Sequence, residues 1–206
     1  MPETRTAAPL ILASASRARR DMLHAAGLAF EVVPADVDED ALRAGMSTGK
    51  DAPDPSNVAR VLAEAKSVHV SKQRRGALVI GADQILALGT RIFTKPANRE
   101  DARGSLLDLR GQTHALHSAV AVARNGNVQW TLVDVASLTM RGFSDEFLES
   151  YLEAAGERVC SSVGAYEIEG LGIGLFEAIA GSHFTILGLP LLPLLTELRR
   201  MGALPS

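Results

Sequence analysis

The chain has 206 residues, of which 47% are hydrophobic and 22% are charged. This usage is ordinary for a globular protein and excludes a disordered or coiled-coil chain. Its 21 lysines and arginines against 24 aspartates and glutamates give a formal net charge of −3, which argues against a dedicated nucleic-acid binder. One cysteine, Cys160, excludes an intramolecular disulfide, and no apolar run is long enough to span a membrane. We therefore expect a single domain over residues 1–206, cytoplasmic, with no stable nucleic-acid or membrane partner.

The first part of the chain alternates apolar strands with amphipathic helices. The apolar run at 10–13 predicts a buried strand, and Ser16 is a favourable N-cap for a helix over 17–26. On that helix Arg19 lies on the face that should be buried, so its guanidinium needs a partner. The next predicted elements are a strand at 30–33, a loop at 45–55, a helix over 56–71 and a strand at 78–82 that ends at Asp83.

The second part of the chain introduces a hairpin. Two strand-like runs, 114–124 and 128–140, flank Asn125-Gly126, which is a strong signal for a tight hairpin turn. The other predicted elements are a helix over 99–109, a helix from Ser144 to Gly156, a glycine-rich segment at 164–174 and a helix over 191–201. This order of elements predicts an α/β fold with a mixed sheet.

Two loops follow predicted strands and carry polar side chains. In an open α/β sheet, ligands bind beyond the carboxyl ends of the strands, so Ser14, Ser16, Arg19 and Asp83 would converge if the two strands are parallel neighbours. The loop at 14–19 suits phosphate, because a helix N-terminus, two hydroxyls and an arginine all attract anions. The alternative is an ordinary helix cap on an arginine-rich surface, and the buried-side position of Arg19 favours the functional interpretation.

Asp83 directly follows five apolar residues, and a carboxylate is costly to bury without a partner. It therefore needs a cation, hydrogen-bond donors or a metal, and oxygen ligands of this kind suit magnesium or manganese. The acidic run at 36–40 has the composition of a solvated loop. Lys66 and Lys95, taken alone, have the character of surface lysines.

Taken together, these segments resemble the Maf family of nucleoside triphosphate pyrophosphatases, and in particular its 7-methyl-GTP pyrophosphatase-like branch. The matching landmarks come in the family's order along nearly the whole chain. They are the Ser-x-Ser-x-x-Arg loop at 14–19, Val37-Asp38-Glu39, Ala63-Glu64-Ala65-Lys66, Gly81-Ala82-Asp83-Gln84, Lys95-Pro96 and the segment 164–170.

The resemblance implies hydrolysis of a nucleoside triphosphate between its α and β phosphates, with Mg²⁺ or Mn²⁺ as cofactor. It also implies a mixed, elongated and twisted sheet with flanking helices, two lobes around a central cleft, and a homodimer. By the same resemblance Asp83 is the catalytic proton acceptor, and Glu39 joins it in holding the metal. The phosphate-binding residues would be Ser14, Ser16, Arg19, Lys66 and Lys95.

The resemblance also implies which residues select the base: Ala18, Gln84 and Glu169. The branch that acts on dTTP and UTP has other residues at these positions. A carboxylate at 169 is physically suited to guanine, which offers N1–H and N2–H donors, and to a positively charged methylated base. Uracil and thymine present carbonyl acceptors, which Glu169 would repel. We therefore expect a purine substrate such as 7-methyl-GTP.

The sequence leaves other functions open. The main hypothesis is an enzyme that limits the incorporation of modified nucleotides into nucleic acids. An alternative is a nucleotide-binding regulator of septum formation and cell division that acts through a partner. A third is a phosphate-ester hydrolase, which would release orthophosphate first. Asp83, Glu39 and both lysines favour an enzyme over the regulator, because binding alone needs no carboxylate to activate water.

Overall fold

The computed structural model describes residues 8–46 and 53–205. The chain divides into two compact units. Unit 1 comprises residues 1–84, 118–134 and 182–206, and unit 2 comprises residues 85–117 and 135–181. The expectation of a single domain over 1–206 stays a prediction. Residues 47–52 of the predicted loop at 45–55 lie outside the described residues.

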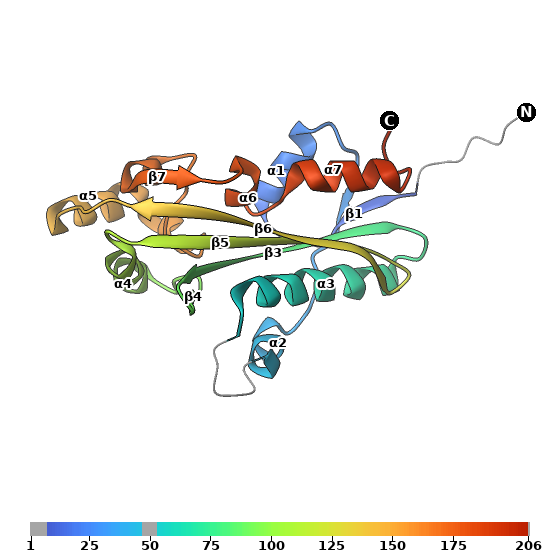
Figure 1. Cartoon of the computed structure of the whole chain (residues 1–206), viewed down its shortest axis with the longest axis horizontal. Helices are drawn as coiled ribbons and strands as arrows, with labels where there is room; N and C mark the ends of the chain where they lie inside the picture. The colour runs from blue at the N-terminus through green and yellow to red at the C-terminus, as the bar shows by residue number, and fades with distance from the viewer. Residues whose placement is uncertain (1–7, 47–52, 206) are drawn as a thin grey trace, which may run out of the picture. The chain divides into compact units, whose positions relative to one another are not determined.

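Seven strands form one sheet in the described part of the chain (Figure 1), in the order β2-β1-β3-β5-β6-β7, with β4 pairing β3. β1 pairs in parallel with β2 and β3, whereas β3 with β4 and β6 with β7 pair antiparallel. The prediction of an α/β fold with a mixed sheet is thus confirmed. The strands are β1 (Leu10–Leu12), β2 (Glu31–Val32), β3 (Leu78–Leu88), β4 (Arg91–Phe93), β5 (Thr113–Arg124), β6 (Asn127–Met140) and β7 (Phe176–Ala180).

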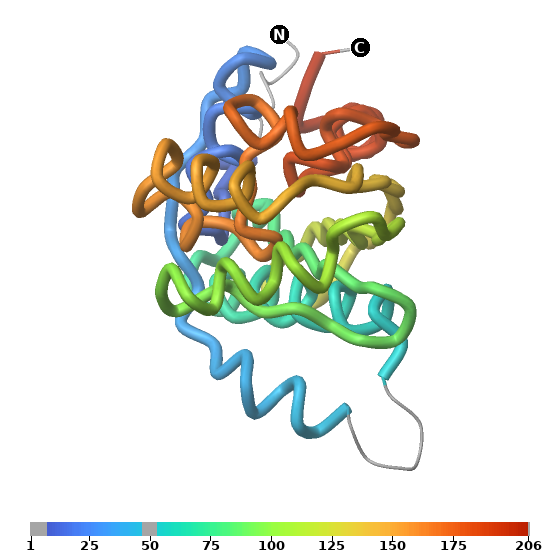
Figure 2. Tube along the Cα trace, turned by 90° about the vertical axis from the view of Figure 1, so that its left-hand side faces the viewer, coloured from blue at the N-terminus to red at the C-terminus, as the bar shows by residue number. Residues whose placement is uncertain are grey.

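Unit 1 is layered, with helices on both faces of its strands (Figure 1). Leu12 and Ile80 face a core that includes Leu23 and Leu194, so α1 and α7 cover this face. On the other face, Val70 of α3 packs in a second cluster with Ile11 of β1 and Val79 of β3. Figure 2 shows the chain turned by 90°, with α2 as the light-blue helix that packs against α3. The helices of unit 1 are α1 (Arg17–Ala25), α2 (Glu39–Met46), α3 (Pro55–Gln73), α6 (His183–Ile186) and α7 (Leu191–Arg200).

Unit 2 contains two helices that pack on each other, α4 (Arg99–Leu109) and α5 (Asp145–Ala155). Its short 3₁₀ helices are η1 (Gly156–Cys160) and η2 (Leu171–Leu175). Ser144 caps α5 through its hydroxyl, as the sequence predicts, since that oxygen accepts from the Phe147 amide at 3.2 Å. None of the described helices in either unit is long and apolar enough to cross a membrane.

The hairpin between β5 and β6 forms at the predicted turn. Asn125 and Gly126 both have positive φ, 52° and 82°. A two-residue type I′ hairpin turn requires positive φ at both of its central residues. Asparagine and glycine tolerate this left-handed backbone better than other residues.

The prediction that a strand ends at Asp83 is wrong, because β3 continues to Leu88. Ile85, Leu86 and Ala87 are buried and extend the apolar run past the carboxylate. The strand β1 is shorter, and its last residue, Leu12, lies opposite Ile80. Asp83 therefore lies beyond the carboxyl end of the neighbouring strand β1, although it is in the middle of its own strand, β3. The short elements β4, β7, α2 and α6 are not among the predicted ones.

Glycine at position 81 allows α3 to lie directly on the backbone of β3. A Cβ atom there would be 2.2 Å from the carbonyl oxygen of Ala63 and 2.6 Å from the amide nitrogen of Ser67. These are backbone atoms of a buried helix, so the contact cannot be relieved by rotating a side chain.

We predict that Gly81→Ala lowers the free energy of unfolding by about 1–3 kcal/mol or more, because the added methyl group overpacks this contact. Urea unfolding measures the change. Gly104→Ala is the matched control, since Gly104 is exposed in α4 and a Cβ there meets nothing within 4 Å. It should stabilise the protein by about 0.5–1 kcal/mol. Equal effects of the two substitutions would contradict the close contact.

Candidate functional site

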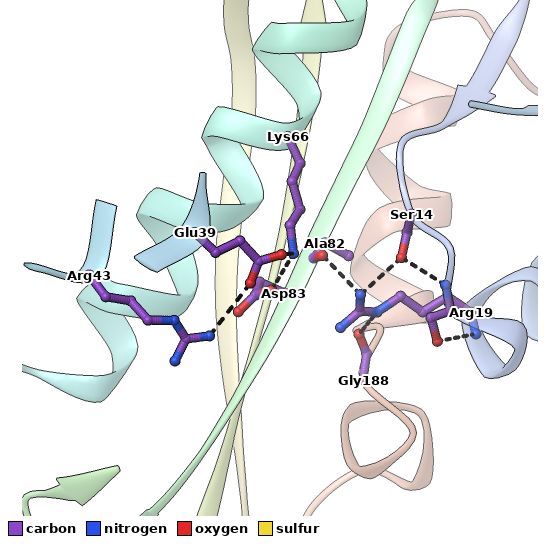
Figure 3. Close-up of polar contacts among 9 residues, drawn as sticks. Ser14, Arg19, Glu39, Arg43, Lys66, Ala82, Asp83 and Gly188 are labelled. Carbon is purple, nitrogen blue, oxygen red and sulfur yellow. Dashed lines mark hydrogen bonds and ion pairs between the residues drawn. The ribbon is translucent and has the colours of Figure 1, made fainter. Parts of the chain in front are cut away.

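An ammonium group bridges two carboxylates in unit 1 (Figure 3). The Nζ atom of Lys66 lies 2.6 Å from Oδ1 of Asp83 and 2.7 Å from Oε1 of Glu39. The side chains of Lys66 and Asp83 are 12% and 8% exposed, whereas that of Glu39 is 40% exposed. Three of the predicted site residues, from α2, α3 and β3, therefore meet at one point.

The contact of α3 with Gly81 explains this meeting. Side chains alternate along a strand, so Gly81 and Asp83 share the face of β3 that α3 covers. On the helix, Ala63 and Ser67 contact Gly81, and Lys66 lies on the same side one turn after Ala63. The ammonium is thereby brought over the carboxylate two residues along the strand.

The charge of Glu39 depends on its neighbours. Burial alone would raise the pKa of this carboxyl, but the hydrogen bond and charge of Lys66, with those of Arg43, lower it below its usual value. Arg43 follows one helical turn later and lies 3.6 Å from Oε2 of Glu39. Glu39 is therefore ionised at neutral pH. Arg43 is not among the predicted site residues, although its i,i+4 spacing from Glu39 is the sequence signal of such a pair.

The second carboxylate oxygen of Asp83 has no hydrogen-bond partner within the described residues. Oδ1 accepts from Lys66, but Oδ2 is buried and unpaired. A buried, unpaired carboxylate oxygen is costly and uncommon in a folded protein. Such an atom suits a water molecule or a cation that the protein itself does not provide.

Arg19 is buried, as its position in the sequence predicts, and it finds its partners in unit 1 (Figure 3). Its Nε donates to the carbonyl of Gly188 at 2.8 Å, and its Nη1 donates to Ser14 Oγ at 3.0 Å and to the carbonyl of Ala82 at 2.9 Å. Nη2 takes part in none of these bonds. Burial lowers the pKa of Arg19, and the charges of Asp83 and Glu39 oppose that shift. Gly188 is not among the predicted site residues, because it contributes a backbone carbonyl, which no side-chain pattern indicates.

The predicted phosphate-binding loop is ordered by its own hydroxyls. Ser16 caps α1 by accepting from the Arg19 amide at 3.4 Å, and Ser14 Oγ accepts from the Ser16 amide at 3.3 Å. In these contacts both hydroxyl oxygens act as acceptors. These contacts do not use the O–H hydrogen of either serine, which is still able to donate.

Gln84 lies on the opposite face of β3 from Asp83. Its Nε2 donates to Ser118 Oγ at 2.9 Å and to the carbonyls of Thr185 and Ile186 at 3.1 and 3.0 Å. The amide group is thus engaged in holding α6 to the sheet. Ala18, the second residue predicted to select the base, is half-buried on α1.

Lys95 and Glu169 belong to unit 2, and their roles in the site stay predictions. Both are exposed, with Lys95 two residues after β4. The segment before Glu169 is firmly held, because Tyr166 contacts His114 Nε2 through its hydroxyl at 2.7 Å and Tyr151 donates to the Ala165 carbonyl at 3.0 Å. Burial lowers the pKa of His114 to about 4, so its ring is neutral at physiological pH.

The described residues of unit 1 thus provide two kinds of charged site. Asp83 and Glu39 offer oxygen atoms to a cation, while Arg19, Lys66 and the two serine hydroxyls offer donors to an anion. No cluster of three or more histidine, cysteine, aspartate or glutamate side chains that could hold a metal occurs in 8–46 and 53–205. Further metal ligands would have to come from the anion itself or from water.

Comparison with known proteins gives consistent results. Residues 9–201 match the family model described as Maf-like protein. The chain is 53% identical over 195 residues to a 7-methyl-GTP pyrophosphatase of Mesorhizobium japonicum, covering 95% of this chain and 97% of that protein. It is 49% identical over 191 residues to a nucleoside triphosphate pyrophosphatase of Rhodopseudomonas palustris, covering 93% of each. A solved HAM1 protein from Coxiella burnetii is 17% identical, with a TM-score of 0.41 over 65% of this chain and 73% of that one, a likeness too weak to support an inference.

The buried position of Arg19 predicts a stability effect. Arg19→Met should lower the free energy of unfolding by about 2–4 kcal/mol, because the Gly188 and Ala82 carbonyls would lose their donor in a buried place. Arg17→Met is the control, since the Arg17 side chain is 86% exposed, and it should change stability by less than about 0.5 kcal/mol. Chemical denaturation measures both. A loss below 1 kcal/mol for Arg19→Met would mean that its hydrogen bonds contribute little.

Proposed function

Because the chain belongs to the Maf family, we propose that it is a nucleoside triphosphate pyrophosphatase, which hydrolyses its substrate to a nucleoside monophosphate and pyrophosphate. Two relatives that are 53% and 49% identical to this chain, and that it covers over 97% and 93% of their lengths, are named as pyrophosphatases of this kind and support this reaction. In this proposal the enzyme removes modified nucleotides before they are incorporated into nucleic acids. The homodimer expected from the resemblance is part of the same proposal.

The observation that carries the proposal is the buried, unpaired Oδ2 of Asp83. A general base needs a free lone pair within hydrogen-bond distance of the water whose proton it takes. Lys66 occupies Oδ1 and leaves Oδ2 for this role. In the proposed reaction Asp83 accepts the proton as water attacks phosphorus, and no covalent intermediate forms.

A divalent cation, magnesium or manganese, fits the carboxylate pair. The unpaired oxygen of Asp83 and the ionised Glu39 are the hard oxygen ligands that these cations prefer. When bound, the cation would neutralise phosphate charge and make a water molecule more acidic. Asp83 and Glu39 are the residues proposed to hold it.

The phosphate chain is proposed to bind the cationic and hydroxyl groups. Ser14 and Ser16 have O–H donors left over, and Arg19 has Nη2 left over. Lys66 and Lys95 would add charge that stabilises the phosphate oxygens as the bond to the leaving group breaks. The position of Lys95 in unit 2 makes its contribution an expectation from the family resemblance.

The base is proposed to be a purine, with 7-methyl-GTP as the leading substrate. Glu169 can accept from the N1–H and N2–H groups of guanine and attract a positively charged methylated ring. Gln84 would contact the base through the carbonyl oxygen of its amide, because its Nε2 already donates to Ser118 and to backbone carbonyls of α6. Ala18 would contribute to base selection by leaving space for the larger purine ring.

The reaction is tested with Asp83→Asn, in which the side chain keeps its shape but loses its basicity. We expect kcat to fall by about 10²–10⁴-fold, with pyrophosphate, not orthophosphate, as the first product of the unmodified enzyme. Asp108→Asn is the control, because Asp108 pairs with Arg91 at the surface, and it should leave turnover unchanged. Unchanged turnover in Asp83→Asn would remove Asp83 from the role of base. Orthophosphate as first product would overturn the proposed reaction.

The base preference is tested with Glu169→Gln. The ratio of kcat/KM for 7-methyl-GTP over UTP should fall about tenfold, because a charged acceptor becomes neutral. Glu167→Gln is the matched control from the same segment, where Glu167 pairs instead with Ser161 and Arg158. If Glu169→Gln leaves the ratio at its original value, this carboxylate does not read the base.

A further inference from the structure

Lys66 has a position that its proposed role as a phosphate ligand does not explain. Its Nζ lies within hydrogen-bond distance of both Glu39 and Asp83, so the ammonium is directed at the carboxylates. These are the same two side chains that are proposed to hold the divalent cation. The ammonium thus occupies one oxygen of each carboxylate, so a divalent ion on the remaining oxygen of Asp83 would lie close beside it.

The two cations cannot bind the same two carboxylates without strong repulsion. Mg²⁺ binds its oxygen ligands at roughly 2.0–2.1 Å, and the ammonium nitrogen is only 2.6 Å from Oδ1 of Asp83 and 2.7 Å from Oε1 of Glu39. The side chains of Lys66 and Asp83 are 12% and 8% exposed, so solvent screens this repulsion only partly. Binding of the divalent ion is thus opposed for as long as the ammonium stays between the two carboxylates.

The phosphate chain of a nucleotide offers the ammonium another partner. Lysine has a flexible stem of four carbons and three donors that rotate freely. Moving from the carboxylates to phosphate oxygens keeps its charge paired throughout. Arg19 cannot move in this way, because its Nε and Nη1 are fixed by the carbonyls of Gly188 and Ala82 and by Ser14.

We propose that Lys66 is a resident counter-ion that couples cation binding to nucleotide binding. Without nucleotide it holds the carboxylates of Glu39 and Asp83 and opposes the divalent ion. Nucleotide phosphate draws it away, and both carboxylates can then bind the cation without a neighbouring positive charge. By linkage, the cation then strengthens nucleotide binding by the same factor. This inference rests on the proposed function, since it takes Glu39 and Asp83 as the cation ligands.

The test is a calorimetric titration of the nucleotide-free full chain with Mn²⁺, which measures the dissociation constant of the ion. Lys66→Met keeps the length of the side chain and removes its charge. We expect it to bind Mn²⁺ at least about tenfold more tightly than the unmodified chain, because the competing ammonium is gone. Lys72→Met is the matched control: Lys72 is exposed in the same helix, α3, and its loss removes the same charge. Its Mn²⁺ affinity should stay within about twofold.

The result that would overturn the inference is a Lys66→Met variant that binds Mn²⁺ no more tightly than the unmodified chain. An equal gain in Lys72→Met would also overturn it, because net charge and not competition would then be the cause. Lys66→Gln serves as the second neutral variant if circular dichroism shows that Lys66→Met does not fold.

Asp83→Asn separates failure of this inference from failure of the proposed function. If Asp83→Asn weakens Mn²⁺ binding in the Lys66→Met background and Lys66→Met alone gains nothing, the carboxylates bind the cation and only the inference fails. If Asp83→Asn changes Mn²⁺ affinity in neither background, the proposed cation ligands are wrong and the inference fails with them.

Discussion

The contact between α3 and the backbone of β3 at Gly81 is the constraint on which the site depends. Any side chain at this position would collide with the Ala63 carbonyl, and the helix would have to move away from the sheet. That movement would withdraw Lys66 from Asp83, which lies two residues after the glycine. A residue with no side chain therefore determines the electrostatics of its neighbours, through a packing distance and not through any chemistry of its own.

β3 also separates the charges of the site. Asp83 faces α3 and Lys66, and the bonds of Arg19 run to Ser14 and to backbone carbonyls (Figure 3). The next residue of the strand, Gln84, faces the opposite side and bonds to Ser118 and α6. If Arg19 formed a direct pair with Asp83, the free carboxylate oxygen would be used up. Keeping the guanidinium on its own acceptors lets it influence Asp83 by charge alone, and Oδ2 stays unpaired.

Much of this arrangement follows from local sequence patterns. The cap at Ser16, the buried side of Arg19 and the turn at Asn125-Gly126 are local features, and each is found where predicted. The end of β3 was not predictable in the same way. A carboxylate in an apolar run normally marks the end of a strand, and here an ion pair from a helix 17 residues earlier compensates it. Such long-range pairing leaves no trace in a local pattern. The same is true of Gly188, whose carbonyl and not its side chain meets Arg19.

The fixed guanidinium of Arg19 has a thermodynamic consequence for recognition. An arginine side chain that is free in solution loses rotational freedom when it grips a ligand, at a cost of up to about 2 kcal/mol. Here three hydrogen bonds to the protein have already immobilised Nε and Nη1. That ordering took place during folding. An anion that binds Nη2 therefore costs the Arg19 side chain little further conformational entropy. The entropic cost of ordering Arg19 is thus part of the free energy of folding and not of the free energy of anion binding.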